Sequence, residues 1–252
     1  MGFRICGFGP LTMRVAYRII NPVANITLVV LAYRSMEWLS WCMEGVGKAR
    51  TDITYRWLVV ANDAEDEVVG GLQAASFDWV DHRSDNPGEW YINRVYRAWN
   101  RGVLEARTQH VVMLNSDMWP ADYWLDALVW AKKTNPASVP TSLLVESGRI
   151  PSAMPETALD CGTNPETFDE AKFTAHFRAI VKPGKIEPGR LFMPMLVDRQ
   201  EFMDVGGYPP GNPIGTTGDK DLVRRYKAAG LKHTTALGSV VYHCQEGEMR
   251  WP

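Results

Sequence analysis

Residues 110–117 read HVVMLNSD, an apolar run followed by three polar residues. Apolar runs rich in β-branched residues are typical of strands that are covered on both faces of a sheet, so we expect a strand at 110–114. Asn115, Ser116 and Asp117 follow this strand directly. Since ligands of open α/β sheets bind at the carboxyl ends of the strands, Asp117 is the sharpest candidate for a functional carboxylate.

Helices and strands alternate on both sides of this run. Apolar residues that share one helical face predict a helix at 89–108, and a proline suited to a first helical turn predicts another at 120–133. Upstream, apolar runs predict strands at 26–32 and 55–61, and Ser35 is placed to cap a helix between them. Strands that alternate with helices imply an α/β fold with a mainly parallel sheet flanked by helices.

Further along the chain, the pattern weakens and then returns. Prolines and glycines are frequent at 134–190, which predicts a loop-rich excursion within the domain. A strand is then expected at 191–198, a helix at 219–229 that ends at Gly230, and a last strand at 238–242.

Composition favours one folded domain and excludes several classes of protein. The chain has 252 residues, 46% of them hydrophobic, which suits a globular domain and not a disordered chain. Its net charge is -2 and it has no long basic run, unlike a non-specific nucleic-acid binder. The four cysteines form no CxxC pair, so we expect reduced thiols. Without a signal-peptide pattern or an apolar segment of about 20 residues, we expect a soluble, cytoplasmic protein with no membrane span.

Three of the predicted strands end in polar groups. These groups are Tyr33-Arg34, Asn62-Asp63 and Asn115-Ser116-Asp117. Each alone is explained by a turn or a helix cap, but the three together favour a ligand site. The carboxylate of Asp117 can hold a hard divalent cation that bridges two phosphates, and Mn²⁺ or Mg²⁺ suits an oxygen-rich site completed by phosphate and water.

Other candidate residues lie in the last quarter of the chain. Asp219 and Asp221 open the predicted helix at 219–229. Either is explained as a helix cap, or as a general base that accepts the proton of a hydroxyl group. The helix dipole favours the ionised form of a carboxylate in this position. His243 ends an apolar strand, and it is either a structural histidine or a metal ligand through a neutral ring nitrogen.

These segments, in their order, resemble the family 2 glycosyltransferases, which share the GT-A fold. The resemblance runs from about residue 26 to residue 243. It is carried by LVVLAYR, LVVANDA, NRVYRAWNRG, VVMLNSD, EFMDVGGYPP, GDKDLVRRYKAAGLK and VYH. Each segment alone is loose, but their order and spacing make the resemblance specific. It implies a GT-A fold with a mixed, mainly parallel sheet.

The resemblance also implies roles for individual residues. Those expected to contact a nucleotide diphosphate sugar are Tyr33, Arg34, Asp63, Asn93, Asn100, Asn115 and Ser116. Asp117, which matches the last acid of the family's DxD motif, and His243 are expected to hold Mn²⁺ or Mg²⁺. Asp219 takes the place of the catalytic base, with Asp221 as the alternative. The implied reaction is the inverting transfer of a hexosyl or pentosyl group to an acceptor hydroxyl.

Under this interpretation the chain is a single GT-A domain in three parts. Residues 1–25 form an N-terminal extension, 26–133 a nucleotide-binding half and 134–252 an acceptor-binding half. The sequence departs from the family pattern at two positions. Asn115 stands where the first acid of the DxD motif is expected, and Gly218 stands where a glutamate precedes the catalytic aspartate.

Two other functions stay open on the sequence alone. A non-catalytic nucleotide- or glycan-binding module, built on a decayed transferase, is compatible with Asn115 and Gly218. A sugar nucleotidylyltransferase has a related fold, but it requires a glycine-rich loop with Arg and Lys near the N-terminus, and none follows ITLVVLA. The acceptor of a transferase reaction would be a glycan, a lipid-linked sugar, a protein or a modified nucleic acid.

Overall fold

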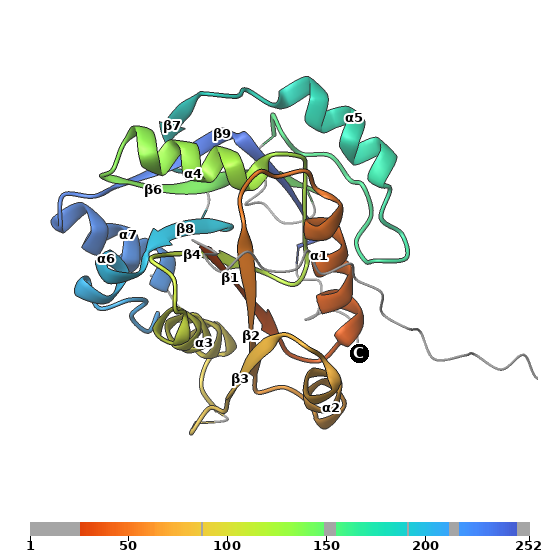
Figure 1. Ribbon diagram of the computed structural model, residues 1–252, viewed down its shortest axis with the longest axis vertical. Coiled ribbons are helices and arrows are strands. Elements are labelled where there is room, and N and C mark those ends of the chain that lie inside the picture. Colours follow the sequence, from red (N-terminus) through yellow and green to blue (C-terminus); the bar gives the residue numbers. More distant parts are fainter. Residues whose placement is uncertain (1–25, 87, 149–154, 191, 212–216, 246–252) are drawn as a thin grey trace, which may run out of the picture.

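The computed structural model describes residues 26–86, 88–148, 155–190, 192–211 and 217–245 (Figure 1). The extension predicted at 1–25 lies outside these residues. The strands are β1 (Ile26–Ala32), β2 (Tyr55–Asn62), β3 (Asp78–His82), β4 (His110–Leu114), β5 (Met118–Pro120), β6 (Ser138–Glu146), β7 (Ile186–Pro188), β8 (Met195–Asp198) and β9 (Lys232–His243). The helices are α1 (Met36–Lys48), α2 (Asp66–Ala74), α3 (Tyr91–Glu105), α4 (Trp124–Thr134), α5 (Glu170–Ile180), α6 (Arg199–Asp204) and α7 (Gly218–Ala228).

The described strands form one mixed sheet in the order β3-β2-β1-β4-β8-β6-β9-β5, with β7 paired to β9. The neighbours β3, β2, β1 and β4 are parallel, and β6 is parallel to β9. Because β8 is antiparallel to both β4 and β6, β6 and β9 run in the same direction as β4. The carboxyl ends of all these parallel strands therefore meet along one edge of the sheet, and the predicted mainly parallel sheet is confirmed.

Helices cover both faces of the sheet (Figure 1). On one face, Leu28 and Val30 of β1 belong to a buried cluster with α1, α2 and α4. On the other face, Val29 and Leu31 belong to a second cluster with α3, α6 and α7. This double cover explains why β1 is apolar on both of its faces and has Thr27 as its single polar residue. No helix of the described residues is both long and apolar enough to cross a membrane.

The region 134–190 is not the loop-rich excursion that its composition predicted. It contains α5, β7 and also β6, a strand that is buried along its whole length inside the sheet. Polar residues interrupt the apolar pattern of β6, although they are buried and bond to side chains of β9. Ser138 Oγ lies 2.6 Å from Thr234 Oγ1, and Ser142 Oγ lies 2.7 Å from Ser239 Oγ.

Several predicted boundaries also differ from the structure. Pro120 does not begin a helix but ends β5, which pairs with β9, and α4 begins at Trp124. The last strand begins at Lys232 and is longer than predicted, because most of it is paired with β6. The short elements α2, β3 and α6 were not predicted. β3 reads DWVDH and is partly exposed at the edge of the sheet, so it lacks the apolar run of a covered strand.

Helix α3 lies very close to the sheet at Gly102. A Cβ atom at this position would lie 2.4 Å from Val29 Cγ1 and 3.1 Å from Val60 Cγ2. Real Cβ atoms do not come within 2.4 Å of another carbon, so only a glycine permits this packing against Val29. Gly102 therefore sets the distance between α3 and the strands β1 and β2.

The Gly102→Ala substitution should destabilise the protein by about 1–3 kcal/mol, because an added methyl group overpacks a filled core. Gly70→Ala in α2 is a matched control, since its Cβ would meet nothing within 4 Å. Alanine in place of a helical glycine should stabilise the protein by roughly 0.5–1 kcal/mol at such a position. Chemical unfolding measures both changes, and a Gly102→Ala variant as stable as the wild type would contradict the close packing.

Candidate functional site

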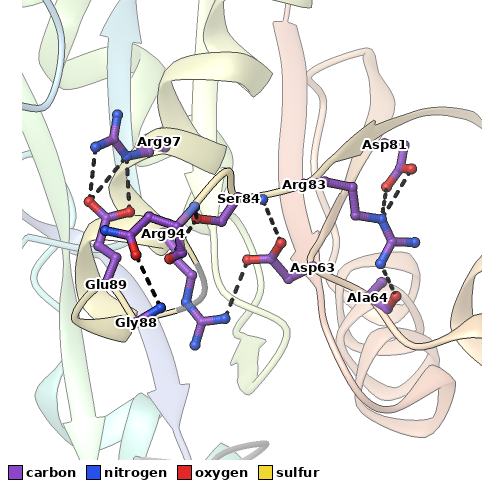
Figure 2. Close-up of polar contacts among 10 residues, drawn as sticks. Asp63, Ala64, Asp81, Arg83, Ser84, Gly88, Glu89, Arg94 and Arg97 are labelled. Atoms are coloured by element: carbon purple, nitrogen blue, oxygen red, sulfur yellow. Dashed lines mark hydrogen bonds and ion pairs between the residues drawn. The ribbon is translucent and has the colours of Figure 1, made fainter.

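The end of β2 carries Asp63 in a fixed position (Figure 2). Its backbone is left-handed, with φ 49°, and its N–H donates to the carbonyl of His82 over 2.8 Å. Asp63 Oδ1 accepts a hydrogen bond from the N–H of Ser84 at 2.6 Å, and Oδ2 lies 3.4 Å from Arg94 Nη1 of α3. The carboxylate of Asp63 is thus held between the segment after β3 and the first turns of α3.

The end of β1 lies beside this carboxylate. The N–H of Glu65 donates to the carbonyl of Tyr33 over 3.1 Å. Arg34 places its guanidinium carbon 4.8 Å from the centroid of the Tyr33 ring, and its Nε lies 3.6 Å from Glu65 Oε1. The structure therefore brings Tyr33, Arg34 and the segment of Asp63 together, as the strand ends predicted.

The two asparagines of α3 bind backbone groups of the segment that follows α6. Asn100 accepts a hydrogen bond from the N–H of Tyr208 and donates one to its carbonyl, both at 2.8 Å. Asn93 Oδ1 accepts from the N–H of Gly211, also at 2.8 Å. These side chains hold residues 208–211 against α3. The contact of Asn93 and Asn100 with a nucleotide sugar stays a prediction.

The residues after β4 meet the end of β9. Cys244 N–H donates to the carbonyl of Asp117 at 3.0 Å, and Met118 pairs with His243 in the ladder between β5 and β9. His243 Nε2 lies 3.2 Å from Asp117 Oδ2. The two predicted metal ligands, far apart in the sequence, are therefore neighbours in the structure.

Asn115 and Ser116 lie between β4 and Asp117. Asn115 is half-buried, and its carbonyl accepts a hydrogen bond from Cys42 Sγ of α1 at 3.5 Å. Ser116 and Asp117 are buried, each with 8% of its surface exposed. The contact of Asn115 and Ser116 with a nucleotide sugar also stays a prediction.

A third charged residue, Glu146, joins Asp117 and His243. It ends β6 and lies opposite His243 in the ladder between β6 and β9. Glu146 Oε1 lies 2.8 Å from His243 Nδ1, so the imidazole ring stands between two carboxylates. Burial lowers the pKa of His243, but the carboxylates of Asp117 and Glu146 outweigh this effect and raise the pKa to about 10.

The chemistry of these side chains fits a divalent cation that shares its ligands with a substrate. A carboxylate and an imidazole nitrogen are ligands that Mn²⁺ accepts. Glu146 Oε2 is a buried oxygen without a hydrogen-bond partner among the described residues. Within the same part of the chain, no group of three or more His, Cys, Asp or Glu side chains is arranged to hold a metal ion by itself. A cation held here would need oxygen ligands from phosphate and water.

Asp219 and Asp221 have different surroundings. Thr217 is the N-cap of α7, so neither aspartate is the cap. Asp219 Oδ2 accepts a hydrogen bond from Tyr96 Oη of α3 at 2.9 Å. Asp221 forms an ion pair with Arg224 of the same helix. The structure therefore directs Asp219 toward α3 and leaves Asp221 in a local surface pair.

Burial raises the pKa of Asp219, while the hydrogen bond from the Tyr96 hydroxyl group acts in the opposite direction. The net shift is upward, opposite to the effect expected from the helix dipole alone. The rings of Tyr96 and Tyr208 are stacked, with centroids 4.9 Å apart and planes 7° apart. Asp219 thus lies in a partly buried aromatic environment.

The departure at Gly218 has a steric cause. A Cβ atom on Gly218 would lie 2.5 Å from Tyr96 Cε2 and 2.6 Å from the carbonyl oxygen of Pro209. A glutamate cannot occupy this position unless α7 moves away from α3. Because residue 218 has no side chain, Tyr96 can lie against the start of α7 and bond to Asp219.

The sequence did not single out four residues that complete this arrangement: Arg94, Tyr96, Glu146 and Tyr208. Tyr96 lies in the helix predicted at 89–108 and was given no role of its own, although its hydroxyl group reaches Asp219. Glu146 follows the run SLLV, and the rule that polar residues at strand ends form ligand sites would have selected it if β6 had been predicted. Arg94 and Tyr208 lie in the segments NRVYRAWNRG and EFMDVGGYPP that carry the resemblance, but the resemblance gave neither of them a role.

Comparison with known proteins identifies the fold. No protein-family model matches the sequence, and no curated protein matches it. The structure is similar to GalNAc-T7 crystallised with UDP, GalNAc and Mn²⁺, with a TM-score of 0.59 and 12% identity over 87% of this chain and 43% of that chain. It is also similar to TarS 1-349 of S. aureus, with a TM-score of 0.58 and 10% identity over 87% of this chain and 60% of that chain.

Both of these proteins are glycosyltransferases of the GT-A fold, so the predicted GT-A fold is confirmed. The chain spans about half the length of the two structures. The likeness at these low identities concerns the fold.

Replacing Tyr96 by phenylalanine should raise the pKa of Asp219 further. The hydroxyl group donates to the carboxylate, so it stabilises the charged form, and its loss favours the protonated form. Tyr226→Phe is a matched control, because Tyr226 is a buried tyrosine of α7 whose hydroxyl has no partner among the described residues. NMR titration of the labelled Asp219 carboxyl group measures the change. An unchanged or lowered pKa in Tyr96→Phe would contradict the hydrogen bond.

Proposed function

We propose that this chain transfers a sugar from a nucleoside diphosphate sugar to an acceptor hydroxyl group, with inversion at the anomeric carbon and with a divalent cation. The observation that carries the proposal is the meeting of Asp117 and His243 at the carboxyl edge of a GT-A sheet. Asp63 lies at the same edge, at the end of β2, which is where ligands of such sheets bind.

Helix α3 supports the proposal because it links the two ends of the site. Arg94 of this helix contacts Asp63, and Tyr96, two residues further on, contacts Asp219. The nucleoside and the reacting hydroxyl group would therefore be bound against one rigid element. Such positioning is a large part of what an enzyme contributes to a reaction between two substrates.

We propose uridine as the nucleoside of the donor. Asp63 is a hydrogen-bond acceptor beside Arg94, which is a donor, and the edge of uracil presents one N–H group between two carbonyl oxygens. Guanine presents two adjacent donors, which need both oxygens of a carboxylate. Asp63 Oδ1 already accepts from Ser84 at 2.6 Å, whereas Oδ2 has only the long contact with Arg94 at 3.4 Å and is left for the single N–H of uracil. GalNAc-T7, which has the same fold, was crystallised with UDP. Tyr33 and Arg34 would line the same pocket.

Asp117 and His243 would hold the cation, Mn²⁺ or Mg²⁺, which supplies positive charge at the leaving diphosphate when it is bound. Asn115 and Ser116, next to Asp117, would contact the donor. The amide of Asn115 carries no charge, so the contribution of this position to cation binding is weaker than that of the acid it replaces.

Asp219 would accept the proton of the attacking hydroxyl group. Its raised pKa makes Asp219 a stronger base than a solvated carboxylate. The hydrogen bond from the Tyr96 hydroxyl group to Oδ2 holds the carboxylate in place. The transition state has oxocarbenium character, as in other glycosyl transfers. Asp221 is the alternative base, but its ion pair with Arg224 occupies its carboxylate.

The half of the chain at 134–252 would bind the acceptor, since it includes Asp219 and the segment held by Asn93 and Asn100. The acceptor belongs to one of four classes: a glycan, a lipid-linked sugar, a protein or a modified nucleic acid. The rival function is a nucleotide-binding module without activity. Asn115 favours that rival, whereas Gly218 does not, because packing against Tyr96 explains it.

Calorimetric titration with UDP, GDP and ADP tests the donor site. UDP should bind most tightly with Mn²⁺ present, and excess EDTA should weaken binding strongly, because Asp117 and His243 meet the diphosphate through the cation. Asp63→Ala should lower the affinity for UDP and reduce the preference over ADP while the circular dichroism spectrum is unchanged. Binding that is independent of both metal and base would contradict the proposed site.

The rate of UDP release from a UDP-sugar tests the catalytic residue, because an active transferase passes some sugar to water even without its acceptor. Asp219→Asn should lower this rate by about 10²–10⁴, with little change in UDP affinity. Asp221→Asn, the matched control two residues away, should stay close to the wild type. If only Asp221→Asn is inactive, the base is Asp221, and if the wild type itself releases no UDP, the chain is a binding module.

A further inference from the structure

The carboxylate of Glu146 is buried at the point where β6 and β9 end. Only 4% of the residue surface is exposed, and Glu146 Oε1 lies 2.8 Å from His243 Nδ1. Glu146 and His243 are paired in the ladder between these two strands, so the backbone fixes their separation. We infer that Glu146 is a positioning residue of the cation site, which orients His243 so that its Nε2 faces the cation.

The orientation of the imidazole ring supports this role. A neutral imidazole has one nitrogen that donates a hydrogen bond and one that can bind a metal. Glu146 occupies Nδ1, and Nε2 points toward Asp117 at 3.2 Å. Histidine ligands of metals commonly donate their second N–H to a carboxylate, which fixes the tautomer and makes the ligand nitrogen a better electron donor.

The charge of Glu146 supports it as well. A buried carboxylate is costly unless its oxygens are bonded or its charge is balanced. Glu146 Oε2 has no hydrogen-bond partner in the part of the chain that the structure describes. The carboxylate of Glu146 lies 2.8 Å from His243 Nδ1 and adds negative charge next to the imidazole ring, whereas the amide of Asn115 adds none. Glu146 of β6 thus provides a negative charge that Asn115 lacks.

The inference rests on the proposed cation site, and a purely structural role is the alternative. In that case Glu146 would only join the ends of β6 and β9 through its hydrogen bond to His243. Glutamine distinguishes the two roles, because its amide oxygen keeps the structural bond from Nδ1–H, but without the negative charge it no longer makes Nε2 a better electron donor to the cation.

The experiment compares Mn²⁺ affinity, measured by electron paramagnetic resonance of free Mn²⁺, for the wild type, Glu146→Gln and Glu105→Gln. UDP is present at one fixed concentration throughout. Glu105 is a control carboxylate on α3 that pairs with Arg101 at the surface. Glu146→Gln should lose about 10- to 100-fold in Mn²⁺ affinity, with a melting temperature close to that of the wild type, and Glu105→Gln should lose none.

The outcomes separate this inference from the function on which it rests. If the wild type binds Mn²⁺ and Glu146→Gln binds it equally well, Glu146 has only a structural role and the proposed function stands. If the wild type does not bind Mn²⁺ with UDP present, the cation site itself is refuted. Should Glu146→Gln not fold, ¹⁵N NMR of His243 in the wild type with Zn²⁺ gives the answer. A proton on Nδ1 with the metal on Nε2 supports the inference, and the reverse arrangement overturns it.

Discussion

The close approach of α3 to β1 and β2 at Gly102 is the constraint on which the candidate site depends. A side chain at this position would collide with Val29, so the helix can lie this close only because residue 102 has none. Three groups of contacts start from the helix so placed. Arg94 reaches Asp63, Tyr96 reaches Asp219, and two asparagines hold the backbone of 208–211. A helix displaced outward by one methyl group would lose several of these contacts together.

The end of the sheet that carries Asp117 depends on a different constraint, the pairing of β9 with its neighbours. β9 is bonded to β6 along most of its length and to β5 near its end. His243 therefore lies beside Asp117 on one side and Glu146 on the other. Glu146 and His243 come from the ends of β6 and β9, and Asp117 comes from the turn just before β5, so the register of the ladders determines their separation. Side chains placed in this way are held at fixed positions, which is what the proposed cation site would need.

Sequence patterns predicted the parallel half of the sheet well and the other half poorly. Strands at 26–32 and 110–114 lie where their apolar runs predicted them, because strands covered on both faces are apolar at nearly all positions. β6 is covered in the same way, but its Ser138 and Ser142 bond to side chains of β9 and so interrupt the apolar pattern. Such pairing involves residues nearly a hundred positions apart, and no local pattern contains it.

The same distinction holds for the site. The sequence pointed to Asp63 and Asp117 because the strands before them were predicted, but it did not point to Glu146 because β6 was not predicted.

The spacing of two asparagines in α3 limits how this helix can change over evolution. Asn93 and Asn100 are seven residues apart, which places them on the same face of α3 to within about 20° and separates them by about 10.5 Å along the axis. The bound backbone of 208–211 matches that spacing. One residue inserted between the asparagines would turn the second by about 100° and break its hold on this segment. The stretch of α3 between the two asparagines therefore cannot vary in length without the loss of this contact.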